Sequence, residues 1–127
     1  MTRILLIGLA GALGTLTRYF VGLGAGRWLG TSFPYGTLIV NVLGCFLIAA
    51  IAHVAASTTM ISPTLRLTLT TGFMGGLTTY SSFNLETTGF FRDRAWTTGF
   101  SNLGLTLVLC FASGMLGLAV ARRFVGP

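Results

Sequence analysis

Hydrophobic residues dominate four long stretches of the chain, and short segments rich in proline, arginine and polar residues separate them. Each stretch reaches the roughly 20 residues that an α-helix needs to cross the hydrocarbon core of a bilayer. The pattern predicts an all-α membrane protein, a single domain of four transmembrane helices over residues 1–127. The expected spans run from about Ile4 to Gly24, Pro34 to Ala56, Pro63 to Phe91 and Thr97 to Ala121.

Local signals support several of these boundaries. Pro34 suits the first turn of a helix, where its missing N–H costs nothing, and Ser62-Pro63 is typical of an N-cap followed by the first helical residue. Trp96 is expected at the level of the lipid headgroups. Small residues four apart in the first span, such as Ala10 and Gly14, predict close packing against another helix.

The third span contains residues that a simple membrane helix would not use. Its middle is Gly72-Phe-Met-Gly-Gly-Leu-Thr-Thr-Tyr-Ser-Ser-Phe-Asn84. Because glycine weakens a helix, we expect the helix to be broken near Gly75-Gly76. Irregular backbone within a bilayer persists only where it is buried in protein or lines a polar cavity, and its freed carbonyls need partners. The segment therefore predicts a site, and a cation held by carbonyl oxygens would satisfy them.

The composition supports a membrane protein with an anionic partner. Hydrophobic residues make up 53% of the chain and charged residues 8%, and the formal net charge is +6. Anionic headgroups or an anion are the expected partners, whereas the dispersed arginines argue against nucleic acid. No nucleophile–base pair, metal-ligand cluster or phosphate loop indicates an enzyme. Cys45 and Cys110 are expected to be small buried hydrophobes rather than a disulfide or a metal site.

The arginines are divided almost equally between the two sides of the membrane. Lys and Arg in short loops orient membrane proteins, so a chain without an excess on one side could insert both ways. We infer an antiparallel two-fold homodimer with its axis in the membrane plane. One side carries Arg3, Arg66, Arg122 and Arg123, and the other carries Arg27, Arg92 and Arg94, with Arg18 inside the first span toward that side.

Polar residues inside the spans have a structural and a functional interpretation. Asn41 could bond to a neighbouring helix or offer amide donors to an anion. Arg18 could extend to the interface or set a positive potential at a vestibule. Glu86 could form an ion pair with Arg92 or Arg94, cap its helix, or act in transport.

The aromatic and hydroxyl residues have the same two interpretations. Tyr80 and Phe83 share a helical face, and they could pack in a core or present electropositive ring edges to a small anion. Thr106 belongs to a small, partly polar stripe with Cys110 and Gly114 that could pack helices or line a pore.

Three features together resemble the Fluc (CrcB) family of bacterial fluoride channels: Gly75–Phe83 with Glu86, Gly36–Asn41, and Arg18. The resemblance covers nearly the whole chain. It implies a channel in the bacterial inner membrane that exports fluoride passively and confers fluoride resistance. It also implies a dual-topology homodimer with two pores and a structural Na⁺ at its centre.

The resemblance assigns roles to particular residues. Backbone carbonyls of Gly75 and Thr78 would hold the sodium ion. The pore would be lined by Asn41, Tyr80, Phe83 and, on the fourth helix, positions near Asn102, Thr106 and Cys110. Tyr80 stands where the family usually has phenylalanine, so it keeps a ring edge and adds a phenol.

Fluoride is small and tightly hydrated, so a pore must replace its water with donors. The Asn41 amide, the Ser81 and Ser82 hydroxyls and the aromatic edges would supply them, and Arg18 and the central cation would offset the cost of a buried charge. The main alternative is a small multidrug-type proton-coupled exporter, which relies on a carboxylate in its first helix. Here the first-helix charge is Arg18. A membrane scaffold without a pore is the third possibility.

Overall fold

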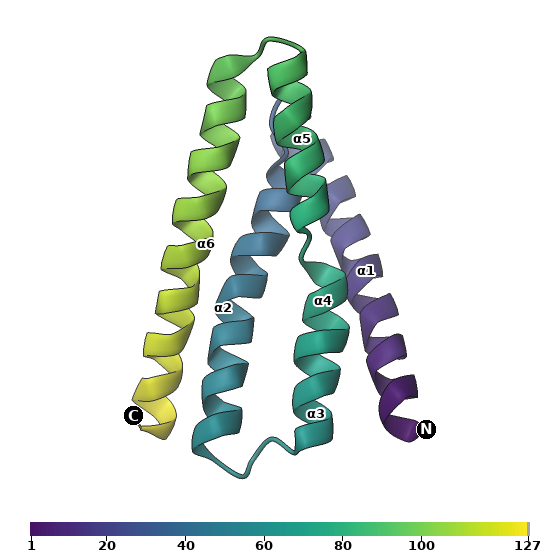
Figure 1. Ribbon diagram of the computed structural model, residues 1–127, viewed down its shortest axis with the longest axis vertical. Helices are drawn as coiled ribbons and strands as arrows, with labels where there is room; N and C mark the ends of the chain where they lie inside the picture. Colours follow the sequence, from purple (N-terminus) through teal and green to yellow (C-terminus); the bar gives the residue numbers. More distant parts are fainter. Residues whose placement is uncertain (127) are drawn as a thin grey trace.

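The structure is a computed structural model that describes residues 1–126, and it consists of helices joined by short turns (Figure 1). The helices are α1 (Thr2–Leu29), α2 (Tyr35–Ser57), α3 (Pro63–Leu67), the π-helix η1 (Thr68–Met74), α4 (Gly75–Leu77), α5 (Tyr80–Arg92) and α6 (Trp96–Val125). The elements α3, η1 and α4 follow one another without a gap, and only Thr78 and Thr79 separate α4 from α5. These four elements form one pass, so the chain makes four passes along the long axis (Figure 1). The prediction of an all-α fold with four helices is confirmed.

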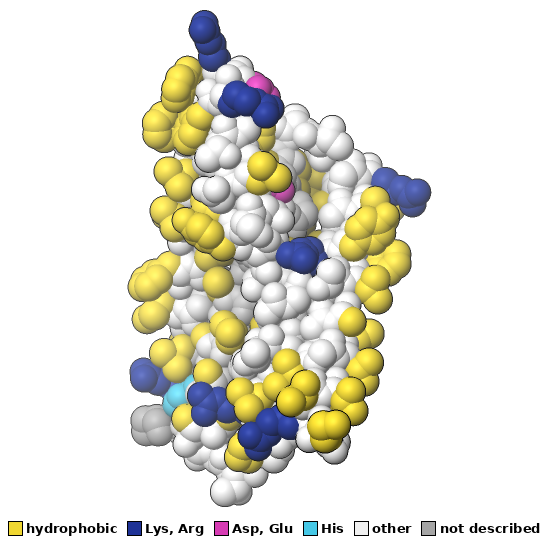
Figure 2. Space-filling view, turned by 45° about the vertical axis from the view of Figure 1, so that its right-hand side comes forward, with side chains coloured by type: hydrophobic (Ala, Val, Ile, Leu, Met, Phe, Trp, Pro, Cys, Tyr) yellow, Lys and Arg dark blue, Asp and Glu magenta, His cyan; other side chains and the backbone are white. Residues whose placement is uncertain are grey.

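Three helices, α1, α2 and α6, are long and apolar enough to cross a membrane. The N-terminus, the last turn of α6 and the α2–α3 turn lie at the lower end of the molecule, and the α1–α2 and α5–α6 turns lie at the upper end (Figure 1). Hydrophobic side chains cover the flanks, and most of the arginines lie toward the two ends (Figure 2). This is the surface of a membrane protein.

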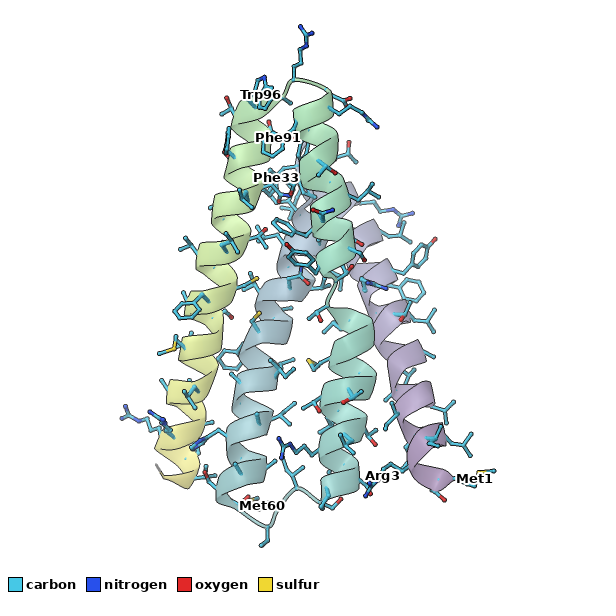
Figure 3. The ribbon with its side chains drawn as sticks, viewed as in Figure 1. Met1, Arg3, Phe33, Met60, Phe91 and Trp96 are labelled. Atoms are coloured by element: carbon cyan, nitrogen blue, oxygen red, sulfur yellow. The ribbon has the colours of Figure 1, made fainter. Side chains whose placement is uncertain are left out.

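The helix boundaries follow the local signals closely. Ser62 is confirmed as an N-cap, because its Oγ accepts a hydrogen bond from the Leu65 N–H at 3.2 Å and Pro63 is the first helical residue. Pro34 precedes α2 instead of entering its first turn. Trp96 begins α6 at the upper end and packs against Phe91, with ring centroids 5.5 Å apart (Figure 3).

The expectation of a break near Gly75-Gly76 is wrong about these two glycines, because both lie within α4. Gly75 has helical dihedral angles, φ −61° and ψ −36°. The chain leaves helical geometry three residues later, at Thr78 (φ −82°, ψ 154°) and Thr79 (φ −152°, ψ 113°). The third pass bends at these threonines, between α4 and α5 (Figure 1).

The glycines of the third pass serve close packing against α1. A Cβ on Gly76 would overlap the Gly11 carbonyl oxygen, and a Cβ on Gly72 would lie 2.8 Å from the Ile7 carbonyl oxygen. On α1, a Cβ on Gly14 would overlap the Phe73 carbonyl oxygen. The predicted close packing at Gly14 is therefore confirmed.

A small core joins three of the four passes. Val40, Met74 and Leu77 are buried together, and Val21 and Phe73 pack against them. On the other side of α2, α6 approaches so closely that a Cβ on Gly117 would overlap the backbone of Phe46. The core of the described chain therefore lies along α2, between α1, η1 and α6.

This packing predicts the effect of adding one methyl group at Gly14. Gly14→Ala would overfill the contact with Phe73 and lower stability by about 1–3 kcal/mol, despite the better helix propensity of alanine. The matched control is Gly8→Ala on the same helix, where a Cβ meets nothing within 4 Å. Thermal unfolding in detergent measures both variants. Equal midpoints for the two would contradict the glycine contact.

Candidate functional site

The side chain of Asn41 holds the backbone of Thr79 with two hydrogen bonds. The Thr79 N–H donates to Asn41 Oδ1 at 2.8 Å, and Asn41 Nδ2 donates to the Thr79 carbonyl oxygen at 3.1 Å. Both residues are buried, with relative exposures of 9% and 7%. In a low-dielectric interior, unpaired backbone groups are costly. The amide of Asn41 thus replaces the helical hydrogen bonds that the chain gives up at Thr79.

Two backbone carbonyl groups beside the bend lose their usual helical hydrogen-bond donors. In a continuous α-helix, the Thr79 N–H would pair with the Gly75 carbonyl, and the Ser82 N–H would pair with that of Thr78. Here the Thr79 N–H goes to Asn41, and the Ser82 N–H donates to Thr79 Oγ1 at 3.1 Å. The carbonyls of Gly75 and Thr78 therefore lose the donors that a continuous helix would give them.

Thr79 also caps α5. Its Oγ1 accepts from the Ser82 N–H and lies 3.0 Å from Ser82 Oγ and 3.2 Å from Ser81 Oγ. The two serine hydroxyls are thereby tied to the N-terminus of α5.

Gly44 makes room for the other extended residue. A Cβ on Gly44 would overlap Thr78 Cγ2, so only glycine lets α2 pass this close. Gly44 and Asn41 lie about one turn apart on α2. Gly44 leaves room for the Thr78 side chain, and Asn41 bonds to the Thr79 backbone. Sequence reasoning missed Gly44, which carries no polar group to mark it.

A groove of about 880 Å³ opens beside the two threonines, between α2, α5 and α6. Its walls are mostly apolar, with a few polar groups at the Asn41 end. The predicted site residues that line it are Asn41, Thr78, Tyr80, Phe83 and Thr106. Gly75, Ser81 and Ser82 lie outside its lining.

The two predicted aromatic residues stand at this groove in different environments. Phe83 is buried, whereas 77% of Tyr80 is exposed. Their ring centroids are 5.6 Å apart with an interplanar angle of 58°, so the rings meet at a tilt. The Tyr80 ring therefore projects outward from the chain at the edge of the groove.

A second groove, of about 440 Å³, contains Glu86. Thr37 Oγ1 donates to Glu86 Oε1 at 2.6 Å, while the buried Oε2 has no hydrogen-bond partner among residues 1–126. The interpretation of Glu86 as the ion-pair partner of Arg92 or Arg94 is wrong. Instead, Arg92 pairs with exposed Asp93 at 2.8 Å, and this bond holds the pKa of Asp93 below its usual value.

The two grooves lie along one face of α2. Thr37 lines the smaller groove and Asn41, one helical turn later, lines the larger. On α5, Glu86 lines the smaller groove, and Phe83, about one helical turn earlier, lines the larger. Arg18 is half-buried on α1 and lines neither groove, and the part of the chain described here gives it no ion pair.

Comparison with known proteins of similar sequence shows to which family the chain belongs. The pattern of the family described as CrcB-like protein, Camphor Resistance (CrcB), matches residues 5–118. The chain belongs to the CrcB family. It is 52% identical over 125 residues to a fluoride-specific ion channel FluC of Sorangium cellulosum, covering 98% of both chains. It is 43% identical over 122 residues to one of Geobacter sp. strain M21, covering 96% of this chain and 98% of that one.

Of the α6 positions that the resemblance placed at the pore, Cys110 lines the larger groove and Asn102 does not. Asn102 is buried and donates from Nδ2 to Thr87 Oγ1 at 2.9 Å, which ties α6 to α5. Cys45 and Cys110 are half-buried, not buried as expected, and both line the larger groove. In both cases the partners are far apart in sequence, so only the packing of α6 brings them together.

The two hydrogen bonds between Asn41 and Thr79 predict the result of removing the Asn41 amide. Asn41→Ala would leave a buried N–H and a buried carbonyl unpaired, which costs about 1–3 kcal/mol for each group. We expect a lower thermal midpoint and faster hydrogen exchange at the Thr79 amide. Asn84→Ala is the control, because Asn84 is exposed on α5. Unchanged exchange at Thr79 in Asn41→Ala would refute the role of this side chain.

Proposed function

We propose that this chain is a fluoride channel that lets fluoride leave the cytoplasm passively through the bacterial inner membrane. The observation that carries the proposal is one groove in which Asn41, Tyr80, Phe83 and Thr106 come together from three helices. The curated relatives named as fluoride-specific channels match nearly the whole chain, which supports the same function. The proposal describes a channel and not an enzyme.

The contacts in the groove suit a small anion that has lost part of its water. Asn41 Nδ2 has two hydrogens, and one is used by the Thr79 carbonyl, so one remains as a donor. The Thr106 hydroxyl and the edges of Tyr80 and Phe83 supply further weak contacts. Several weak contacts allow an ion to enter and to leave again, as conduction requires.

The groove is half of a pathway in this proposal, and an antiparallel second copy supplies the other half. Tyr80 is largely exposed, as are apolar neighbours of the groove such as Phe111 and Met115. A phenol on an exposed ring is better placed against protein than against lipid chains. The balanced arginines at the two ends fit a subunit that inserts in both orientations.

A sodium ion fits the carbonyl groups beside the groove. Carbonyl oxygens are hard ligands suited to a hard cation. Gly75 and Thr78 present carbonyls whose usual helical donors are engaged elsewhere. When bound, the ion would add positive charge where an anion passes, and two copies of the bend would double the ligands.

A proton-coupled exporter is the weaker candidate. That mechanism needs a carboxylate in the first helix, and α1 contains none. The acids of the chain are Glu86 and Asp93, at α5.

Ion flux from liposomes tests the function. We expect rapid fluoride efflux, measured with a fluoride electrode, and at least about a hundredfold slower chloride efflux. Phe83→Ile removes a ring edge and Asn41→Asp replaces an amide donor with a negative charge, so each should slow fluoride by at least about tenfold.

Phe124→Ile is the matched control, because Phe124 is 82% exposed near the end of α6. Wild-type rates in Phe83→Ile and Asn41→Asp would remove these residues from the pore. Absence of fluoride efflux from the parent protein would refute the channel itself.

Labelling of a loop residue tests the dual topology. Thr31→Cys places a thiol in the exposed α1–α2 turn, in a background where Cys45 and Cys110 are serine. In sealed vesicles an impermeant maleimide should label about half of the chains from outside, because the arginine balance favours neither orientation. Labelling of nearly all or nearly none of the chains would show a single orientation.

A further inference from the structure

Two cysteines from different helices lie side by side in the larger groove. Cys110 on α6 and Cys45 on α2 line the same stretch of this groove, with Gly44 and Thr106 beside them in its lining. Both are free and half-buried, and both line the groove. They are therefore reachable from the cavity and close enough to act together.

The packing of α2 against α6 fixes this pair. Ser113 Oγ donates to the Val42 carbonyl at 2.8 Å, and a Cβ on Gly114 would lie 3.7 Å from the Cys45 carbonyl oxygen. Gly117, one turn further, has no room for a Cβ against Phe46. These contacts on successive turns hold the two helices in one register, which keeps Cys45 and Cys110 at the same level of the groove.

We propose that Cys45 and Cys110 form a two-coordinate binding site for a thiophilic d¹⁰ cation, such as Hg²⁺, Ag⁺ or Cu⁺. Thiolates are the preferred ligands of such soft ions. Zinc would need about four ligands, and residues 1–126 contain no group of three His, Cys, Asp or Glu residues that could hold a metal. Two thiols without a third His, Cys, Asp or Glu ligand among residues 1–126 therefore favour an ion that accepts linear coordination.

Binding is an exchange of protons for the metal. Each thiol loses its proton, two sulfur–metal bonds form, and no electron is transferred. The ion then sits across the groove, one helical turn from Thr106, which also lines it. This consequence rests on the proposed function: a cation bound there narrows the fluoride pathway, so it should block flux.

The experiment uses the full-length protein in detergent, reduced with a phosphine, and Hg²⁺ as the probe. One equivalent of Hg²⁺ per chain should protect both thiols from maleimide, and mass spectrometry should show one mercury bound. Cys45→Ser and Cys110→Ser each leave one sulfur, so a monothiol competitor should strip mercury from them at a concentration at least about a hundredfold lower than from the parent protein.

Two equivalents of mercury per chain, or equal retention by the parent and both serine variants, would overturn the site. Fluoride efflux with and without Hg²⁺ is measured separately for each protein, and the block should be at least about tenfold stronger in the parent. If mercury binds as expected and no protein conducts fluoride, the proposed function fails and the site stands. If fluoride flows normally and mercury is not held by both thiols, the site fails and the channel stands.

Discussion

The pair of hydrogen bonds between the Asn41 amide and the Thr79 backbone is the constraint on which the rest of the site depends. A membrane interior offers no water to a backbone group that leaves its helix, so another part of the protein must replace the lost partner. Asn41 does so for both the N–H and the carbonyl of Thr79. Gly44, on the same face of α2, admits the Thr78 side chain. The position of the bend is therefore set by α2 as much as by the third pass itself.

Most of the fold could be predicted from the sequence because a bilayer permits so few alternatives. Apolar length determines the passes, and Ser62-Pro63 marks a helix start through a local hydrogen bond. The Gly75-Gly76 pair was misassigned because glycine has two uses in a membrane helix: it loosens the backbone, and it allows another helix to approach. Gly76 has the second use, against Gly11, and that neighbour is visible only in the packed structure.

The site was predicted in part, and what was missed follows a physical rule. Asn41, Tyr80, Phe83 and Thr106 have side chains whose chemistry is conspicuous in an apolar span, and the structure brings them to one groove. Gly44 has no side chain to notice, and the bond from Thr37 to Glu86 joins residues 49 positions apart. The adjacency of Cys45 and Cys110 depends on the register of α2 and α6, which no local pattern encodes.

Among residues 1–126, no arginine lines either groove, which matters for the passage of an anion. The charged residues in their linings are Glu86 and Asp93, both acidic. An anion in a low-dielectric groove needs compensating positive potential. The N-terminus of α5 begins at the larger groove and contributes its dipole, as half-helices do in other membrane ion sites. A half-helix supplies only a partial charge, so the proposed channel would need the cation proposed at the Thr78 carbonyl to provide the remainder, with Arg18 acting from outside the path.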